Sequence, residues 1–333
     1  MLVGQTNHRG CSIVSRQRRA TKALALSLLA FWIIVVAAAA SPAIADEAPN
    51  RVRIEYAPPK SPKYQDLINR LKANRALEKM QEMFGSFKLS NDILLRTMEC
   101  GMANAWYQRP TVTICYEYME DIEKGIRKDT HDGITPNDAA LGQFIYVVAH
   151  EMGHALFDAL NVPLLGQPED AADEFSTYMM LSFGKQDARR LVHGAAYGYK
   201  DYVRNPKVTV PLHAFSDAHG APMQRFYNLL CIAYGADQET FGDLVDHQHL
   251  SETRALFQGH LPEGRARGCR IEFGELNFAF QHLLKPHVDQ QLAKAVLQDG
   301  WLPDVLAEPD VPPDPPQNKE IRENANKANS VRR

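Results

Sequence analysis

The sequence predicts an α+β fold, in which a mixed N-terminal part with a small sheet precedes a mainly helical C-terminal part. Three segments in the first half have the alternating or β-branched composition that is typical of strands, at residues 51–56, 93–98 and 111–116. From residue 138 onward, apolar residues recur at helical spacing. Of the 333 residues, 45% are hydrophobic and 23% charged, so one large domain or two small ones can bury a core.

Residues 1–45 have the three parts of a secretory signal peptide. Basic residues come first, residues 23–40 form an apolar run with Ser27 as its one polar residue, and Ala43-Ile44-Ala45 supplies the small residues of a cleavage site. We therefore expect cleavage after Ala45 and a secreted or periplasmic mature protein. The alternative is an uncleaved helix that anchors the chain, because an apolar run of this length could just span a bilayer.

Loss of this leader makes the mature chain acidic. Of the 37 Lys and Arg residues, five lie in the leader, which leaves 32 against 40 Asp and Glu, a net charge of −8. An acidic surface argues against nucleic acid or an anionic membrane as the main partner. We also expect that the mature protein does not span a membrane unless the leader stays uncleaved.

The N-terminal part contains the predicted strands and one predicted helix. Residues 51–56 alternate between apolar and polar side chains, as a strand does, until Pro58-Pro59 ends the pattern. Between residues 64 and 84, apolar residues recur at helical spacing and predict one amphipathic helix. Residues 93–98 and 111–116 predict two further strands, the second rich in Thr, Val, Ile and Tyr.

The C-terminal part begins with a long helix, predicted from about residue 138 to residue 160, where Asn161-Val162-Pro163 ends it. Pro168 starts the next helix, because proline suits the first helical turn. Further helical segments are predicted near residues 187–199, 221–234, 251–258 and 273–284. After about residue 308, proline and then polar residues dominate, which predicts a disordered tail.

These elements predict four parts of the chain. A signal peptide occupies residues 1–45 and a disordered tail occupies residues 308–333. Between them we expect an N-terminal subdomain at residues 46–160, which ends with the long helix, and a helical subdomain at residues 161–307.

Four cysteines remain after the leader, namely Cys100, Cys115, Cys231 and Cys269. An even number in an oxidising compartment predicts two disulfides. We pair Cys100 with Cys115 and Cys231 with Cys269, because each pair lies within one expected substructure. A zinc site with four thiolates is the alternative, but the chain has no C-x-x-C pair.

The long helix contains H-E-M-G-H at residues 150–154, a pattern that is typical of zinc hydrolases. Residues four apart on a helix share one face, about 6 Å apart along the axis, so His150 and His154 can bind one ion. Zinc accepts such ligands tetrahedrally and keeps one position for water, from which Glu151 can take a proton. Apolar neighbours make an unpaired charge costly here, so metal ligation explains the polar cluster better than a core histidine does.

A third ligand is expected at the start of the following helix. Glu169 and Asp173 are four residues apart, so Glu169 can bind the metal while Asp173 accepts a hydrogen bond from a ligand histidine. Asp170 is the rival ligand, and Asp173 itself is a more distant one. The remaining alternative is a solvated acidic turn, which is common at a helix N-terminus.

H-E-M-G-H followed by E-x-x-A-D at residues 169–173 resembles the gluzincin metallopeptidases, which include the thermolysin-like and CAAX-prenyl-protease-like branches. The resemblance implies a zincin-like fold. It also implies that Glu169 is the third zinc ligand and that Asp173 orients a ligand histidine.

Asn104-Ala105-Trp106-Tyr107 is similar to the gluzincin edge strand that pairs with the substrate backbone. The similarity implies that Asn104 and Ala105 bind substrate. An edge strand has free backbone groups and can therefore bind an extended peptide largely without regard to its sequence. A plain hairpin or turn before Pro110 is the alternative.

The mature chain as a whole resembles a bacterial family that is catalogued as a domain of unknown function and described as metallopeptidases. Its pattern covers most of residues 50–285, in five segments at residues 99–107, 114–117, 150–154, 169–173 and 224–231. The resemblance implies a metallopeptidase and names no substrate.

The remaining catalytic role is stabilisation of the oxyanion that forms during hydrolysis, which gluzincins assign partly to a His, Tyr or Arg of the helical half. His219 is our first candidate, oriented by a neighbouring acid, and Tyr227 is the second. The alternative for His219 is an ordinary residue of a surface loop.

Two alternative functions therefore follow from the sequence. The first is an exported zinc metallopeptidase with one Zn²⁺ ion, which cleaves a peptide or protein substrate after Glu151 activates a zinc-bound water. The second is a zinc-binding protein without catalysis, which serves metal handling or protein interaction. Glu151 favours the enzyme, because hydrolysis requires this carboxylate and metal binding does not.

Overall fold

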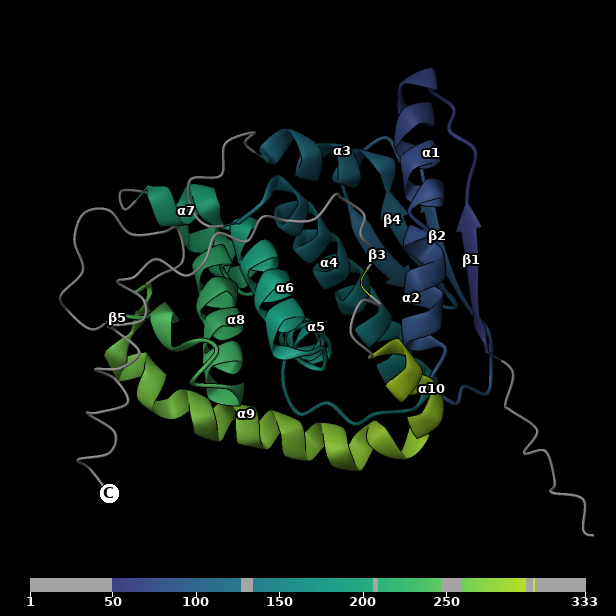
Figure 1. Ribbon diagram of the computed structural model, residues 1–333. Helices are drawn as coiled ribbons and strands as arrows, with labels where there is room; N and C mark the ends of the chain where they lie inside the picture. The colour runs from purple at the N-terminus through teal and green to yellow at the C-terminus, as the bar shows by residue number, and fades with distance from the viewer. Residues whose placement is uncertain (1–49, 127–133, 206–208, 247–258, 298–301, 303–333) are drawn as a thin grey trace, which may run out of the picture. The chain divides into compact units, whose positions relative to one another are not determined.

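The computed structural model describes residues 50–126, 134–205, 209–246 and 259–297, together with residue 302 (Figure 1). The predicted signal peptide, the helix expected at residues 251–258 and the expected tail lie outside these residues. A four-stranded sheet lies in the N-terminal part and the C-terminal part is mainly helical, so the α+β class is confirmed.

The sheet consists of β1 (Val52–Tyr56), β2 (Ile93–Met98), β3 (Ala105–Gln108) and β4 (Thr111–Cys115), in the order β1-β2-β4-β3. β1, β2 and β4 run parallel, whereas β3 pairs antiparallel with β4 and lies at the edge of the sheet. The strands predicted at residues 51–56, 93–98 and 111–116 are confirmed, except that Tyr116 already begins a helix.

The prediction of a single helix between residues 64 and 84 is wrong, because two helices occupy this stretch. α1 (Gln65–Ala73) and α2 (Ala76–Phe84) are separated at Arg75, whose φ of 52° is left-handed. The backbone N–H of Leu77 donates to the hydroxyl of Tyr56 at 2.8 Å, which satisfies an amide in the first turn of α2. Both helices contribute to the same core, so apolar residues keep recurring across the break.

α4 (Pro136–Ala159) carries H-E-M-G-H and is buried along most of its length. Pro136 occupies its first turn, and the Thr135 hydroxyl accepts a hydrogen bond from the N–H of Asp138 at 3.0 Å, which caps the helix. β3, β4, α3 (Tyr116–Gly125), α5 (Pro168–Leu181) and α6 (Lys185–Tyr197) all contact it. A helix enclosed in this way holds its side chains in place.

The backbones of α4 and α6 approach each other through two glycines. A Cβ on Gly142 would lie 2.5 Å from the carbonyl oxygen of Leu191, and a Cβ on Gly194 would overlap the carbonyl of Asp138. Any larger residue at either position would push the two helices apart. The position of α4 therefore depends on this contact.

α8 (Pro222–Ala236) and α9 (Glu263–Leu283) complete the main helical part, and α8 also contacts α5. The Cys231–Cys269 disulfide joins α8 to α9 with the Cα atoms 5.0 Å apart, as the sequence predicted. Short elements that the sequence did not predict are α3, α7 (Lys200–Arg204), α10 (Gln290–Val296), β5 (Val245–Asp246) and β6 (Leu261–Pro262).

The buried hydrophobic residues of the described ranges form one cluster, to which the sheet and the C-terminal helices both contribute. The division of the chain at residue 160 stays a prediction. Within the described ranges, every helix is too short or too polar to cross a membrane.

Candidate metal centre

His150, Glu151 and His154 lie on the enclosed part of α4. His150 is 4% exposed and Glu151 is 7% exposed. The Nε2 atoms of His150 and His154 are 3.3 Å apart, and the two rings meet edge to face. The spacing of four residues thus directs both imidazoles to one place.

Glu169 reaches the same place from the first turn of α5. Its Oε2 atom lies 2.9 Å from Nε2 of His150 and 3.2 Å from Nε2 of His154. The contact with His150 is the main cause that lowers the pKa of Glu169 to about 2, so this side chain is a carboxylate near neutral pH. Of the acids in this turn, it is Glu169 that approaches both imidazoles.

The spacing of these donor atoms suits a tetrahedral metal ion. Zinc that binds nitrogen or oxygen at about 2.0–2.1 Å holds neighbouring ligand atoms about 3.3 Å apart. The three separations here are 3.3, 3.2 and 2.9 Å. Two imidazoles and one carboxylate also form a known donor set of catalytic zinc. His150, His154 and Glu169 could therefore hold a metal ion together.

Asp173 lies one turn after Glu169 and contacts the far side of the His150 ring. Nδ1 of His150 donates to Oδ1 of Asp173 at 2.8 Å, so that Nε2 on the other side of the ring faces Glu169. Burial raises the pKa of Asp173, but the hydrogen bonds from His150 and Arg225 outweigh this and keep the pKa below its ordinary value. Asp173 is thus ionised and suited to orient His150.

Arg225 is a residue of this centre that the sequence analysis did not identify. It lies in the first turn of α8 and donates from Nε to Oδ2 of Asp173 at 2.6 Å and from Nη2 to Oδ1 at 2.7 Å. The signal available in the sequence was a charged residue next to Phe226 at the start of a predicted helix. Its partner could not be found in this way, because Asp173 lies 52 residues away.

Glu151 lies next to the donor atoms and lines a hollow of about 380 Å³. Burial is the main cause that raises the pKa of Glu151 to about 6, although the charge of His150 opposes this. A carboxyl group with a pKa close to neutrality can both take up and release a proton. Glu151 therefore has the environment of a general base.

The hollow extends from β3 to the helices. Asn104 and Ala105 line it together with His150 and Glu151, so the edge strand lies along the candidate centre. Further lining residues come from the helical side, namely Tyr118, Tyr146, Tyr199 and Arg225. The position of β3 suits a strand that binds an extended chain, and the binding roles of Asn104 and Ala105 stay predictions.

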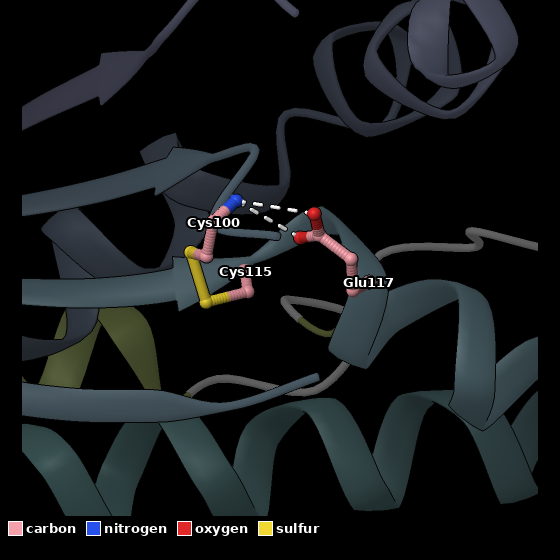
Figure 2. Close-up of side chains that lie close together, drawn as sticks. All are labelled: Cys100, Cys115 and Glu117. Carbon is pink, nitrogen blue, oxygen red and sulfur yellow. Dashed lines mark hydrogen bonds between the residues drawn. A yellow bond between two sulfur atoms is a disulfide. The ribbon is translucent and has the colours of Figure 1, made fainter. Parts of the chain in front are cut away.

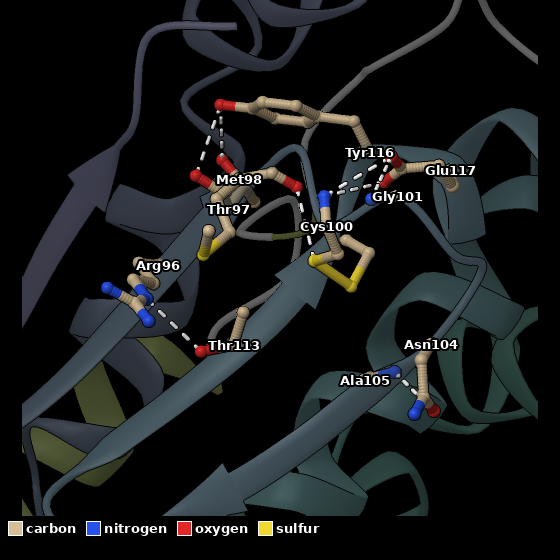
Figure 3. Close-up of a disulfide and its surroundings, with 11 residues drawn as sticks. Arg96, Thr97, Met98, Cys100, Gly101, Asn104, Ala105, Thr113, Tyr116 and Glu117 are labelled. Atoms are coloured by element: carbon tan, nitrogen blue, oxygen red, sulfur yellow. Dashed lines mark hydrogen bonds between the residues drawn. A yellow bond between two sulfur atoms is a disulfide. The ribbon is translucent and has the colours of Figure 1, made fainter. Parts of the chain in front are cut away.

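The Cys100–Cys115 disulfide, which is also one of the two predicted pairs, holds the loop that leads into β3. The carboxylate of Glu117 accepts hydrogen bonds from the backbone N–H of Cys100 at 3.1 Å and of Gly101 at 2.7 Å (Figure 2, Figure 3). The carbonyl of Asn104 accepts from the N–H of Cys115 at 3.0 Å. These contacts hold the start of the edge strand in position.

Cys100, Cys115 and Glu117 also bring three possible donor atoms close together. The two sulfur atoms are bonded to each other, as Figure 2 shows, so neither is a thiolate that could bind a metal ion. This cluster is therefore structural.

The two candidates for oxyanion stabilisation lie in different surroundings. Nε2 of His219 is 2.8 Å from Oε2 of Glu169, and its ring stacks on that of His150 with the centroids 5.6 Å apart. The ring of Tyr227 packs against Phe226 at 5.5 Å. Among the described residues, His219 lines the hollow and Tyr227 does not.

A comparison with protein-family models matches residues 56–284, more than two thirds of the chain, to DUF4344, which is described as "Putative metallopeptidase". No curated protein and no solved structure matches the chain. The match spans β2, β3, β4 and the helices from α1 to α9. It therefore includes the whole candidate centre.

Proposed function

We propose that this chain, which belongs to the DUF4344 family, is an exported zinc-dependent hydrolase that cleaves peptide bonds. His150, His154 and Glu169 would hold one zinc ion. The observation that carries the proposal is that Oε2 of Glu169 lies within 3.2 Å of both imidazole Nε2 atoms, next to the buried carboxyl group of Glu151.

The chemistry divides between the metal and the chain. A bound zinc ion supplies a Lewis acid, which polarises a carbonyl and lowers the pKa of water. Glu151 accepts the proton of the attacking water and passes it to the departing amine, for which a pKa of about 6 is suited. Asp173 and Arg225 keep His150 in the tautomer that presents Nε2 to the metal.

The substrate would bind as an extended chain along β3. Within the described residues, β3 pairs with β4 alone, so its outer N–H and C=O groups can pair with a peptide backbone. Asn104 and Ala105 line the hollow beside Glu151, which brings a peptide on this edge close to the carboxyl group. The substrate is therefore a peptide or an exposed segment of a protein.

We also propose that the protein acts outside the cytoplasm, after cleavage behind Ala45. The two disulfides support this, because disulfides form and persist in oxidising compartments. An anchor that keeps the leader is the alternative, and mass determination of the N-terminus of the exported protein distinguishes the two.

The test compares the mature chain, residues 46–333, with Glu151→Gln and with Glu239→Gln, whose side chain is 79% exposed, as the matched control. We expect bound zinc in all three proteins, and cleavage of a diverse peptide library by the wild type and the control alone. Zinc in all three without any cleavage would favour the non-catalytic zinc protein. Absence of metal from all three would exclude both functions.

A further inference from the structure

The oxygen Oε2 of Glu169 is surrounded by three imidazoles rather than two. Nε2 of His219 lies 2.8 Å from this atom, compared with 2.9 Å for His150 and 3.2 Å for His154. His219 comes from the irregular segment between η2 (Leu212–Ser216) and α8, far along the chain from the other three residues. Three imidazole nitrogens therefore lie within 3.2 Å of this one oxygen atom, and His150, Glu169 and His219 offer three donor atoms that are close to one another.

We infer that His219 is a fourth protein ligand of the metal ion, and that it must leave the ion before a peptide can be hydrolysed. The inference rests on the proposed function and adds regulation to it. Catalytic zinc has three protein ligands and one open position, whereas four protein ligands close a site. His219 would thus act as a displaceable ligand that keeps the enzyme in a resting state.

The two ring nitrogens of His219 have the same kinds of partner as those of the ligand candidate His150. Each ring directs Nε2 to Oε2 of Glu169 and Nδ1 to an aspartate, which is Asp173 at 2.8 Å for His150 and Asp217 at 3.4 Å for His219. Metal-ligating histidines commonly hydrogen-bond through the second nitrogen to a carboxylate. Asp217 would therefore orient His219 as Asp173 orients His150.

The distance to Glu169 separates this role from oxyanion stabilisation. An oxyanion donor lies about 2.7–3.1 Å from the substrate oxygen, so this oxygen must fit between the donor nitrogen and the metal ligands, which then lie beyond direct contact with that nitrogen. A separation of 2.8 Å between Nε2 of His219 and Oε2 of Glu169 leaves no such space. In this arrangement His219 can contact the ion itself, and not a substrate held against it.

The segment that carries His219 is weakly held. The η2 helix has no buried residue, Leu212 is 87% exposed and Phe215 is 61% exposed. The side chain of His219 is 44% exposed, against 5% for His150. Few buried contacts oppose a local movement of this segment, whereas α4 and α5 are packed into the core. His219 is thus the ligand that can leave at low cost.

The first test counts imidazoles on zinc by X-ray absorption spectroscopy of the zinc-loaded mature chain. We expect three in the wild type and two in His219→Ala. His213→Ala is the matched control, because His213 is exposed and lies on the same segment, and it should keep three. Loss of His219 should also raise the zinc dissociation constant, by roughly tenfold, in competition with a chelator. Two imidazoles in the wild type would overturn the inference.

The second test addresses displacement. Acetohydroxamate, which binds zinc through two oxygens, should lower the wild-type count from three imidazoles to two, and a count that stays at three overturns the displaceable role. With zinc in excess, His219→Ala should cleave peptides at least as fast as the wild type. A loss of about 100-fold or more in kcat would instead assign His219 to the oxyanion. A third outcome separates the two proposals. If the wild type shows three imidazoles on zinc and His219→Ala shows two, but neither protein cleaves any peptide, the proposed hydrolase function is wrong and His219 is still a zinc ligand.

Discussion

Arg225 holds the carboxylate of Asp173 with two hydrogen bonds, from Nε at 2.6 Å and from Nη2 at 2.7 Å, and the same carboxylate accepts from Nδ1 of His150 at 2.8 Å. Through Asp173, a residue of α8 thus supports a histidine of α4. The side chain of Asp173 is only 10% exposed, so its charge depends on these partners.

Arg225→Gln should weaken both folding and metal binding. Removal of one partner from a buried ion pair leaves a charge without compensation, and we expect the free energy of unfolding to fall by about 3 kcal/mol. The zinc dissociation constant should rise roughly tenfold, because His150 loses its fixed orientation. Urea unfolding and chelator competition measure the two effects. Gln224→Ala, an exposed neighbour, should change neither, and unchanged zinc affinity in Arg225→Gln would contradict the orienting role.

Glu174 should make the metal-free protein less stable as pH rises. Burial, followed by the charges of Glu272 and Asp170, raises the pKa of Glu174 from 4.5 to about 7. Between these values the folded state binds more protons than the unfolded state, so the free energy of unfolding falls as pH rises from about 4.5 to about 7.

Glu174→Gln should flatten this pH dependence. At pH 8 its free energy of unfolding should exceed that of the wild type by roughly 1–3 kcal/mol. Urea unfolding at pH 5 and pH 8 provides the measurement. Glu239→Gln, with an exposed carboxyl group, is the control and should follow the wild type at both pH values. A variant with the full wild-type slope would show that Glu174 is not the group responsible.

The two disulfides should differ in what their loss affects. Without the Cys100–Cys115 bond, the loop before β3 is held less firmly, so we expect the KM for peptides to rise about tenfold while zinc affinity stays the same. The Cys231–Cys269 bond closes a stretch of 38 residues between α8 and α9, so its loss should cost about 4 kcal/mol of stability and leave KM unchanged. Two double Cys→Ser variants, one for each disulfide, are assayed for KM and for the free energy of unfolding. Equal KM values in the two variants would contradict the prediction.

Gly194→Ala should displace α4 from α6. The new Cβ would overlap the carbonyl of Asp138, and we expect a loss of about 2 kcal/mol in the free energy of unfolding together with weaker zinc binding. Gly268→Ala is the control, because a Cβ at this position on α9 meets no atom within 4 Å. Alanine at position 268 should stabilise the protein by roughly 0.5–1 kcal/mol. If both substitutions changed the free energy of unfolding in the same direction, the close contact at Gly194 would be refuted.

Local patterns predicted much of the fold. β2 lies at residues 93–98, where alternation and β-branched residues predicted it, and α4 and α5 begin within two residues of their expected starts. The break at Arg75 between α1 and α2 was missed, because the apolar residues recur at nearly the same spacing on both sides of one left-handed residue. Periodicity reports which face is buried and not whether the helix is continuous.

The sequence by itself determined the pairs that share one helix. His150 with His154, and Glu169 with Asp173, are four residues apart, and the pitch of a helix then places each pair on one face whatever surrounds it. Only the tertiary structure decided that Arg225 supports Asp173 and that His219 meets Glu169, while Tyr227 packs elsewhere. Those contacts depend on how α8 and the segment before it pack against α4 and α5, and no local spacing encodes the packing of segments so far apart in the chain.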